Sequence, residues 1–249
     1  MKLRLDKLLV DRGLAASRER AQALILSGKV MVDEQKFEKA GAQVAEDCVI
    51  RLLGEDLKYV SRGGLKLERA LDHWKIDVAG KTCLDVGAST GGFTDCLLQR
   101  GAARVIAVDT GYGQIDFQLR QNERVKLFEN TNARYLTREV LGATVDLAVM
   151  DVSFISATLV LPAVVAAAFP ESPQEREGRK IIVLVKPQFE AGREFIGKGG
   201  IVHNESAQTA AVEKVRATLT GLGVAETDVI ESPIRGAGGN RELLLYGRF

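Results

Sequence analysis

Seven short apolar segments rich in β-branched residues follow one another from residue 80 to the end of the chain. Most are separated by stretches that can hold a helix, notably 91–100, 155–168 and 205–222. Strands that alternate with helices form parallel sheets, because each helix carries the chain back over one face of the sheet. The sequence therefore predicts an α/β fold with a doubly wound, mostly parallel sheet. The segments are TCLDVGA, RVIAVDT, VKLFENT, VDLAVMDV, KIIVLVKP, DVIESPI and RELLLYGRF.

The first 60 residues have a different pattern. Four leucines within residues 3–9 lie on one stripe of a predicted helix that ends at Gly13. Ser17 is placed to cap a second helix, which ends at Gly28. Short β-branched runs separated by polar turns follow, as expected of a small sheet. This pattern predicts a compact α+β module.

Positive charge is concentrated at the start of the chain. Residues 1–29 contain seven Lys and Arg against three Asp and Glu, although the net charge of the whole chain is only +1. A basic module is a modest indication of a polyanionic partner, and a module whose charges are merely solvated is the alternative. We predict a small domain at 1–58, a polar, glycine-bearing linker at 59–64 and a large domain at 65–249.

The cysteine and histidine content argues against a metal site or a disulfide framework. Three cysteines are widely spaced, and only two histidines are present. The first residues alternate charge with leucine and so lack the apolar core of a signal peptide. The longest apolar run, 159–169, is shorter than the ~20 residues that span a bilayer. We expect a cytoplasmic chain with reduced thiols, no stable membrane association and no metal.

A glycine-rich turn follows the first strand of the predicted sheet. In open α/β sheets ligands bind at the carboxyl ends of the strands, and glycines there let the backbone approach a ligand. Asp109 ends the second strand, where its carboxylate can accept hydrogen bonds from ribose hydroxyls. The glycine spacing, G-x-x-x-G-G, differs from the dinucleotide fingerprint, so NAD is the less favoured ligand and a plain strand–helix turn is the structural alternative. The candidate cofactor residues are Asp85, Gly87, Ala88, Ser89, Gly91, Gly92, Phe93, Asp109 and Asn132.

This set resembles the S-adenosylmethionine site of class I methyltransferases. The resemblance implies that the Asp85 carboxylate faces the amino group of the methionine moiety. It also implies that Asn132, at the end of the third strand, lies near the adenine.

Three further charged residues stand at the ends of later strands. Asp151 follows the fourth strand, Lys186 follows the fifth, and Glu242 precedes the last. Each has a plain structural explanation, as a helix cap, a surface lysine or an edge residue, but together they fall where such sheets bind ligands. With Lys66, in the segment SRGGLKL, the chain order is Lys, Asp, Lys, Glu. This order resembles the K-D-K-E tetrad of the FtsJ-type ribose 2′-O-methyltransferases.

The resemblance extends over essentially the whole chain. The segment LRLDKLLVDRGLAASRERAQALILSGKVMVD resembles an S4 domain, an RNA-binding module. The segments LDVGASTGGFTDCLLQRGA, MDVSFIS, LVKPQFEAGRE and GKGGIVH are similar to those of the TlyA family, which joins an S4 domain to an FtsJ-like domain. One departure is the pair Asp33 and Glu34, where many S4 domains carry an Asn-Gly turn. The family resemblance implies phosphate contacts from Arg4, Lys7, Arg18, Arg20 and Lys29.

The TlyA family is described both as hemolysin-like and as methylating ribosomal RNA on cytidine. The resemblance therefore implies S-adenosylmethionine as methyl donor and ribosomal RNA or ribosomal subunits as partner. Lys186 would remove the proton of a ribose hydroxyl, Asp151 would orient Lys186, and Glu242 would hold Lys66 or the ribose. Alignment of the hydroxyl with the activated methyl group needs no metal.

Two other classes of function remain open. One is a non-catalytic RNA- or ribosome-binding factor. The other is a hemolysin-like membrane-active protein, for which the sequence offers no strong amphipathic stripe or spanning segment. The loop at 188–206, with Arg193 and Lys198, is either a basic flap over the substrate or a plain surface loop.

Overall fold

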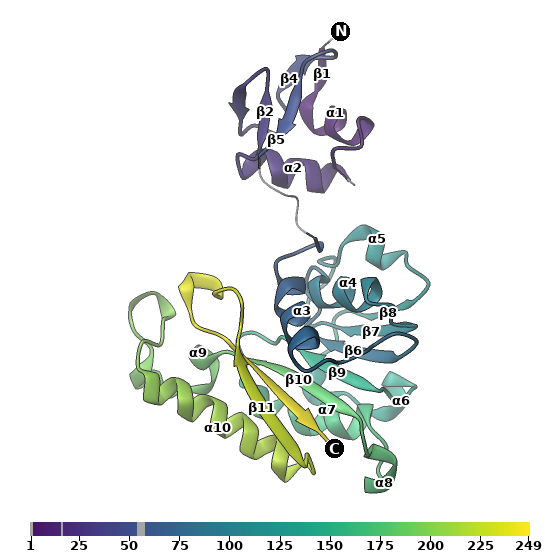
Figure 1. The fold of residues 1–249 in the computed structure, drawn as a ribbon, viewed down its shortest axis with the longest axis vertical. Helices are drawn as coiled ribbons and strands as arrows, with labels where there is room; N and C mark the ends of the chain where they lie inside the picture. The colour runs from purple at the N-terminus through teal and green to yellow at the C-terminus, as the bar shows by residue number, and fades with distance from the viewer. Residues whose placement is uncertain (1, 16, 54–57) are drawn as a thin grey trace. The chain divides into compact units, whose positions relative to one another are not determined.

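The computed structural model describes residues 2–15, 17–53 and 58–249. The chain divides into two compact units, one up to residue 57 and the other from Lys58 onward (Figure 1). Residues 54–57, which the sequence places at the end of the small domain, lie outside the described residues.

The first unit is an α+β module, as predicted. Ser17 caps the second helix, since its Oγ accepts a hydrogen bond from the Arg20 backbone N at 3.2 Å. Leu3, which we predicted to lie in the first helix, belongs instead to a strand, because residues 2–4 pair antiparallel with residues 43–45. A second small sheet has the order β3-β2-β5. The elements are β1 (Lys2–Arg4), α1 (Leu5–Asp11), α2 (Arg18–Leu26), β2 (Val30–Val32), β3 (Gln35–Phe37), β4 (Gln43–Ala45) and β5 (Ile50–Leu52).

Asp33 and Glu34 form the tight turn between β2 and β3 with positive φ angles of 47° and 63°. Two consecutive positive φ values are typical of a type I′ hairpin turn, which favours Asn and Gly. Asp33 is supported by a hydrogen bond from the Val49 N to its Oδ1 at 2.9 Å, whereas Glu34 makes an exposed ion pair with Arg51. Exposed pairs of this kind contribute little to stability.

We therefore expect Glu34→Gly to raise the free energy of unfolding of the first unit by about 1 kcal/mol, because glycine adopts a positive φ without strain. Urea titration of the full chain, followed by a probe in this unit, measures the change. Gln35→Gly, one residue later in a strand, should lower stability instead. An unchanged urea midpoint for Glu34→Gly would contradict the expectation.

The second unit is built on a seven-stranded sheet of order β11-β12-β10-β9-β6-β7-β8, which confirms the predicted fold class. β12 runs antiparallel to both of its neighbours, and the other pairs are parallel. The chain runs outward from β6 to β8 and then returns to β9 on the other side of β6. Such a reversal marks the ligand-binding edge of an open sheet. The strands are β6 (Thr82–Val86), β7 (Arg104–Val108), β8 (Val125–Phe128), β9 (Leu147–Met150), β10 (Lys180–Val185), β11 (Glu226–Glu231) and β12 (Leu243–Arg248).

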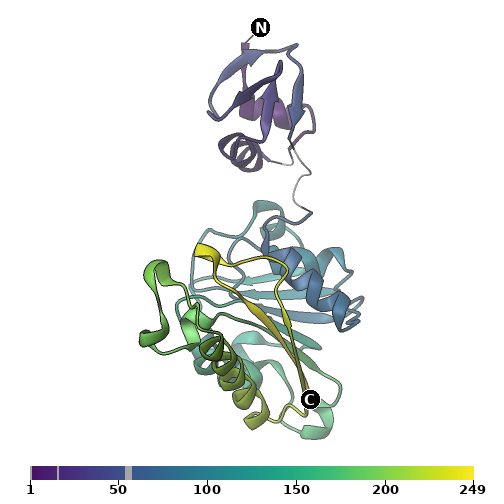
Figure 2. The ribbon, with the colours of Figure 1, turned by 60° about the vertical axis from the view of Figure 1, so that its left-hand side comes forward.

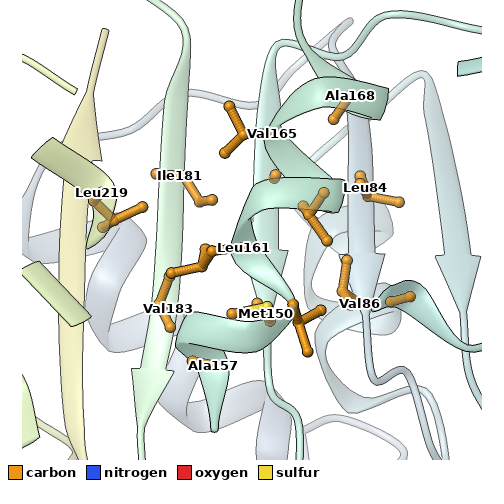
Figure 3. Close-up of a cluster of buried hydrophobic side chains, with 14 of the residues drawn as sticks. Leu84, Val86, Met150, Ala157, Leu161, Val165, Ala168, Ile181, Val183 and Leu219 are labelled. Carbon is orange, nitrogen blue, oxygen red and sulfur yellow. The ribbon is translucent and has the colours of Figure 1, made fainter. Parts of the chain in front are cut away.

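Helices cover both faces of this sheet, and α3 and α10 lie on opposite faces (Figures 1 and 2). Side chains of a strand alternate between the faces, so Leu147 and Val149 of β9 pack toward α3 and α4, while Ala148 and Met150 pack toward α7 and α10. Figure 3 shows Leu161 of α7 over the second of these faces. The helices are α3 (Gly63–His73), α4 (Gly92–Gln99), α5 (Phe117–Arg120), α6 (Arg138–Leu141), α7 (Leu161–Ala168), α8 (Pro173–Arg176), α9 (Pro187–Glu190) and α10 (Glu205–Gly221). Short 3-10 helices are η1 (Ala133–Tyr135), η2 (Ala157–Leu159), η3 (Arg193–Phe195), η4 (Lys198–Gly200) and η5 (Ala237–Gly239).

The segment predicted as a linker, 59–64, packs into the second unit. Tyr59 is buried, and the Val60 backbone N donates to Asp95 Oδ2 at 2.8 Å. Gly63 and Gly64 open α3, and a Cβ on Gly64 would lie only 2.3 Å from the Tyr59 ring. Gly64, which indicated a loose connection, therefore serves close packing between the start of α3 and Tyr59.

Candidate active site

Two cavities open at the carboxyl edge of the large sheet. The first, of about 290 Å³, is lined by Lys66, Asp151 and Lys186 among others, and we call it the lysine cavity. The second, of about 420 Å³, is lined by Asp109 and by the ends of neighbouring strands, and we call it the Asp109 cavity. Their linings share Gly87, Ser89, Asp151 and Ser153. The two cavities therefore meet at the glycine loop and the end of β9.

Each lysine of the predicted tetrad is paired with a carboxylate. Lys66 Nζ donates to Glu242 Oε2 at 2.6 Å, and Lys186 Nζ lies 2.5 Å from Asp151 Oδ1. The second contact is an ion pair without hydrogen-bond angles, because Asp151 Oδ1 has no hydrogen-bond partner among the described groups. Both lysines and Glu242 are less than 10% exposed. Charges so buried need partners, since leaving one unpaired costs several kcal/mol.

The sheet topology explains why these four residues meet. β9 and β10 are parallel neighbours, so the residues that follow them, Asp151 and Lys186, emerge at the same edge. β12 is antiparallel to β10 and pairs Leu243 with Val185, so the residue before it, Glu242, starts at that edge too. Lys66 reaches the group from the first turns of α3. The structure thus brings together all four residues that the sequence singled out.

The glycine loop packs closely against the end of β9. Gly87 has a φ of 85°, and a Cβ there would lie 2.5 Å from the Asp151 carbonyl oxygen. Asp109 is held by two backbone donors: Ser89 N to its Oδ2 at 2.8 Å and Gly111 N to its Oδ1 at 2.6 Å. A largely apolar cavity with a glycine wall and a few fixed polar groups fits a nucleoside-bearing ligand.

Most predicted cofactor residues line one of the two cavities. The Asp109 cavity takes in Gly87, Ser89, Asp109 and Asn132, and Ala88, Gly92 and Phe93 line the lysine cavity together with Gly87 and Ser89. Gly91 lines neither and instead opens α4 with a φ of 96°. Asp85 also lines neither, since its side chain is fully buried on the α4 side of β6.

Asp85 makes a buried contact with α4. Its Oδ2 accepts a hydrogen bond from Thr94 Oγ1 at 2.7 Å, and its Oδ1 has no hydrogen-bond partner among the described groups. Burial raises the pKa of Asp85 to about 7. The strand alternation that turns Leu84 and Val86 to one face turns Asp85 to the other, so a direct contact with a ligand in either cavity would need the loop to move.

The raised pKa of Asp85 predicts a pH dependence of stability. In the unfolded chain this carboxyl loses its proton near pH 3.8, whereas the folded state keeps the proton to about pH 7. The folded state therefore binds more protons between these values, and the free energy of unfolding falls as pH rises through that window. Asp85→Asn removes this loss, so we expect its stabilisation relative to the wild type to be small at pH 4 and largest at pH 8. Urea unfolding at both pH values measures it, and equal effects at both would contradict the assignment.

Sequence reasoning missed two residues at the junction of the cavities. Ser153 lines both, and its Oγ accepts a hydrogen bond from Lys186 Nζ at 2.7 Å. Phe154 lines the Asp109 cavity, is 93% exposed and has a φ of 65°. A positive φ is a genuine outlier for a bulky residue and often marks a functional turn. The segment MDVSFIS contains both residues, but the sequence alone does not show how exposed they are or which φ angle Phe154 adopts.

The loop at 188–206 contributes no residue to the lining of either cavity. Val202 is buried, and its backbone N donates to Asn240 Oδ1 at 3.1 Å, while Asn240 Nδ2 donates to the Gly200 carbonyl at 2.9 Å. These bonds anchor the loop to the segment before β12. The interpretation as a flap over the substrate has no support in this arrangement.

In the first unit, a buried carboxylate organises two of the predicted RNA contacts. Asp6 is fully buried and accepts hydrogen bonds from Arg4, Arg18 and Gln22. The Arg4 guanidinium beside Asp6 holds the pKa of that carboxyl well below its usual range. About half of each arginine side chain remains exposed. Of the other predicted contacts, Lys7 is exposed, and Arg20 and Lys29 are half-buried.

The part of the chain that the structure describes contains no group of three or more side chains suited to hold a metal ion. Among its helices, none combines the length and apolar character needed to cross a membrane.

Comparisons with known proteins match both units to known families. A model of FtsJ-like methyltransferases matches residues 59–249, and an S4 domain model matches residues 3–50. The 16S/23S rRNA (cytidine-2′-O)-methyltransferase TlyA of Mycobacterium tuberculosis is 45% identical over 98% of this chain and 89% of its own. Hemolysin A of Brachyspira hyodysenteriae is 37% identical over 98% and 99%. A solved structure of a protein described as a hemolysin, from Streptococcus thermophilus, is 40% identical with a TM-score of 0.73, covering 99% of this chain and 88% of that one. The chain therefore belongs to the FtsJ-like methyltransferases and, within them, to the TlyA family with its N-terminal S4 domain.

Proposed function

We propose that the protein transfers a methyl group from S-adenosylmethionine to the ribose 2′-hydroxyl of a cytidine in ribosomal RNA. The observation that carries the proposal is the pairing of Lys186 with Asp151 and of Lys66 with Glu242 at the lysine cavity, which meets the Asp109 cavity at Asp151. The name of the M. tuberculosis relative supports cytidine and ribosomal RNA as the substrate class.

The Asp109 cavity fits the proposed methyl donor. Asp109 would accept hydrogen bonds from the ribose hydroxyls, and Asn132 would contact the base. The glycine loop would form the wall beside the methionine part, and Gly87 lets this loop pack against the Asp151 carbonyl, which a Cβ there would approach to 2.5 Å. When bound there, S-adenosylmethionine supplies an electrophilic methyl group.

The lysine cavity supplies the groups that act on the acceptor. A hydroxyl is a poor nucleophile, so its proton must leave as the oxygen attacks. Lys186 in its neutral amine form accepts that proton, and the Asp151 carboxylate stabilises the ammonium that results. Lys66, held by Glu242, presents a cation to the oxygens of the ribose or its phosphate. Much of the rate then comes from alignment of the acceptor with the methyl group.

Residues outside the tetrad give the RNA surfaces to bind. The first unit presents Arg4 and Arg18 in an arrangement fixed by Asp6, suited to phosphates. The exposed ring of Phe154 offers a stacking surface for an unstacked base at the rim of the Asp109 cavity.

The test is incubation of the full chain with labelled S-adenosylmethionine and either ribosomal subunits or free ribosomal RNA, followed by mapping of 2′-O-methyl sites. We expect methylation at cytidine. Calorimetric titration with S-adenosylmethionine separates the alternatives, since a non-catalytic RNA-binding factor would bind RNA but would not bind S-adenosylmethionine. Methyl-donor binding without incorporation into any RNA form would overturn the proposed substrate.

A further inference from the structure

We propose that Ser153 is a positioning residue for methyl transfer, which holds the amine of Lys186 in the orientation that receives the ribose proton. The proposal rests on the function proposed above. Lys186 Nζ has two close partners in the structure: Ser153 Oγ at 2.7 Å and Asp151 Oδ1 at 2.5 Å. Only the first has the angles of a hydrogen bond among the described groups. Asp151 therefore provides a negative charge beside the Lys186 amine, whereas Ser153 fixes the orientation of that amine through a hydrogen bond.

The valence of the amine shows why direction matters. A neutral lysine amine has two N–H groups and one lone pair, and the lone pair must meet the proton of the 2′-hydroxyl. A lysine side chain has four methylene groups joined by rotatable bonds. Its terminal amine therefore rotates freely unless hydrogen-bond partners hold it. With one N–H donated to Ser153, the amine no longer rotates freely, and its lone pair is held toward the hydroxyl in the cavity.

The reaction balances with these groups alone. The proton of the 2′-hydroxyl moves to Lys186 Nζ while the oxygen bonds to the transferred carbon, and the electron pair of the broken carbon–sulfur bond stays on the departing sulfur. The Ser153 hydroxyl exchanges no proton in this scheme. It accepts a hydrogen bond from Nζ before and after the transfer.

The surrounding backbone holds Ser153 in register with Lys186. Glu190, at the end of α9 four residues after Lys186, is buried. Its Oε2 accepts from Ser156 Oγ at 2.5 Å, and its Oε1 accepts from Ala157 N at 2.6 Å. This carboxylate ties the loop that carries Ser153 to the segment that carries Lys186. The strained turn at Phe154 follows Ser153 directly.

The test compares Ser153→Ala with Ser153→Thr, which keeps the hydroxyl oxygen. Ser153 is exposed, so its truncation removes no core contact. With labelled S-adenosylmethionine and the RNA that the wild type methylates, we expect Ser153→Ala to lower kcat about tenfold, the effect of one lost hydrogen bond. KM for RNA, the Kd of S-adenosylmethionine by calorimetry and Tm should stay within about twofold or a degree. Ser153→Thr should recover most of kcat. Ser172→Ala, whose hydroxyl bonds Gln174 in its own turn, is the matched control and should leave kcat unchanged.

The outcomes separate the two proposals. A wild-type protein that methylates no RNA would overturn the proposed function and this inference with it. A wild type that methylates RNA, with Ser153→Ala equally fast, would overturn this inference alone. The inference also fails if Ser153→Ala weakens S-adenosylmethionine binding as much as it lowers kcat, since Ser153 would then be a ligand contact. A Ser153→Thr variant as slow as Ser153→Ala would likewise reject a role for the hydroxyl oxygen.

Discussion

Lys186→Ala is expected to lower kcat for RNA methylation by about 10²–10⁴-fold, the contribution of a well-placed general base. Lys186 lines the lysine cavity and not the Asp109 cavity, so the variant should bind S-adenosylmethionine with nearly wild-type affinity. Incorporation of labelled methyl groups measures the first quantity, and calorimetry measures the second.

Lys180→Ala is the matched control for this change. Lys180 begins the same strand, β10, at the edge opposite the cavities, where its Nζ donates to the Gly178 carbonyl. Its removal should leave methyl transfer close to the wild-type rate. A Lys186→Ala protein that methylated RNA normally would exclude Lys186 as the base and leave Lys66 as the remaining amine of the tetrad.

Gly87→Ala is expected to weaken S-adenosylmethionine binding strongly and to lower methyl transfer with it. The new Cβ would lie 2.5 Å from the Asp151 carbonyl oxygen and 2.9 Å from its carbon, and Gly87 also has a φ of 85°. Backbone atoms of a strand end cannot shift without breaking other contacts. The glycine loop and the end of β9 must therefore separate, which distorts the junction of the two cavities. We expect binding at least tenfold weaker by calorimetry, and a lower Tm.

Gly101→Ala separates steric contact from backbone strain. Gly101 has a similar φ of 87°, but a Cβ there would meet Ala79 at an ordinary 3.5 Å. That variant should lose about 1 kcal/mol of stability from the left-handed backbone and retain binding and activity. Equal effects of the two variants on binding would show that φ alone, and not the contact with Asp151, makes Gly87 necessary. Lys186→Ala should therefore lower kcat without weakening S-adenosylmethionine binding, whereas Gly87→Ala should lower both binding and activity.

The sequence predicted the large sheet because its central strands are buried on both faces. A strand such as β10 must then consist almost wholly of apolar residues, and such a run can be recognised in the amino-acid sequence. Three residues of the candidate tetrad followed from the same logic, and Lys66 was added by the resemblance to FtsJ-type methyltransferases. Charged residues directly beside buried strands must emerge at a sheet edge, and Asp151, Lys186 and Glu242 each stand one position from a strand end.

The structure departs from the sequence patterns where the outcome depends on which way a residue faces or on what it packs against. Asp85 lies two residues before the glycine loop, and strand alternation turns it into the core beside Thr94. The polar, glycine-bearing segment at 59–64 packs into the second unit because the Tyr59 ring occupies the space that a Gly64 side chain would need.

By itself, the sequence determined the α/β class and the glycine loop, because both depend on composition or spacing along the chain, and its resemblance to known families pointed to the S4-like module and the four residues of the tetrad. Only the tertiary structure decided which lysine meets which carboxylate, that the two cavities share a wall, and that Ser153 reaches Lys186. Those relations join residues from 33 to 176 positions apart, and their distances depend on strand register and backbone dihedral angles. Side-chain chemistry at one position cannot encode such distances, because they are properties of the packed sheet as a whole.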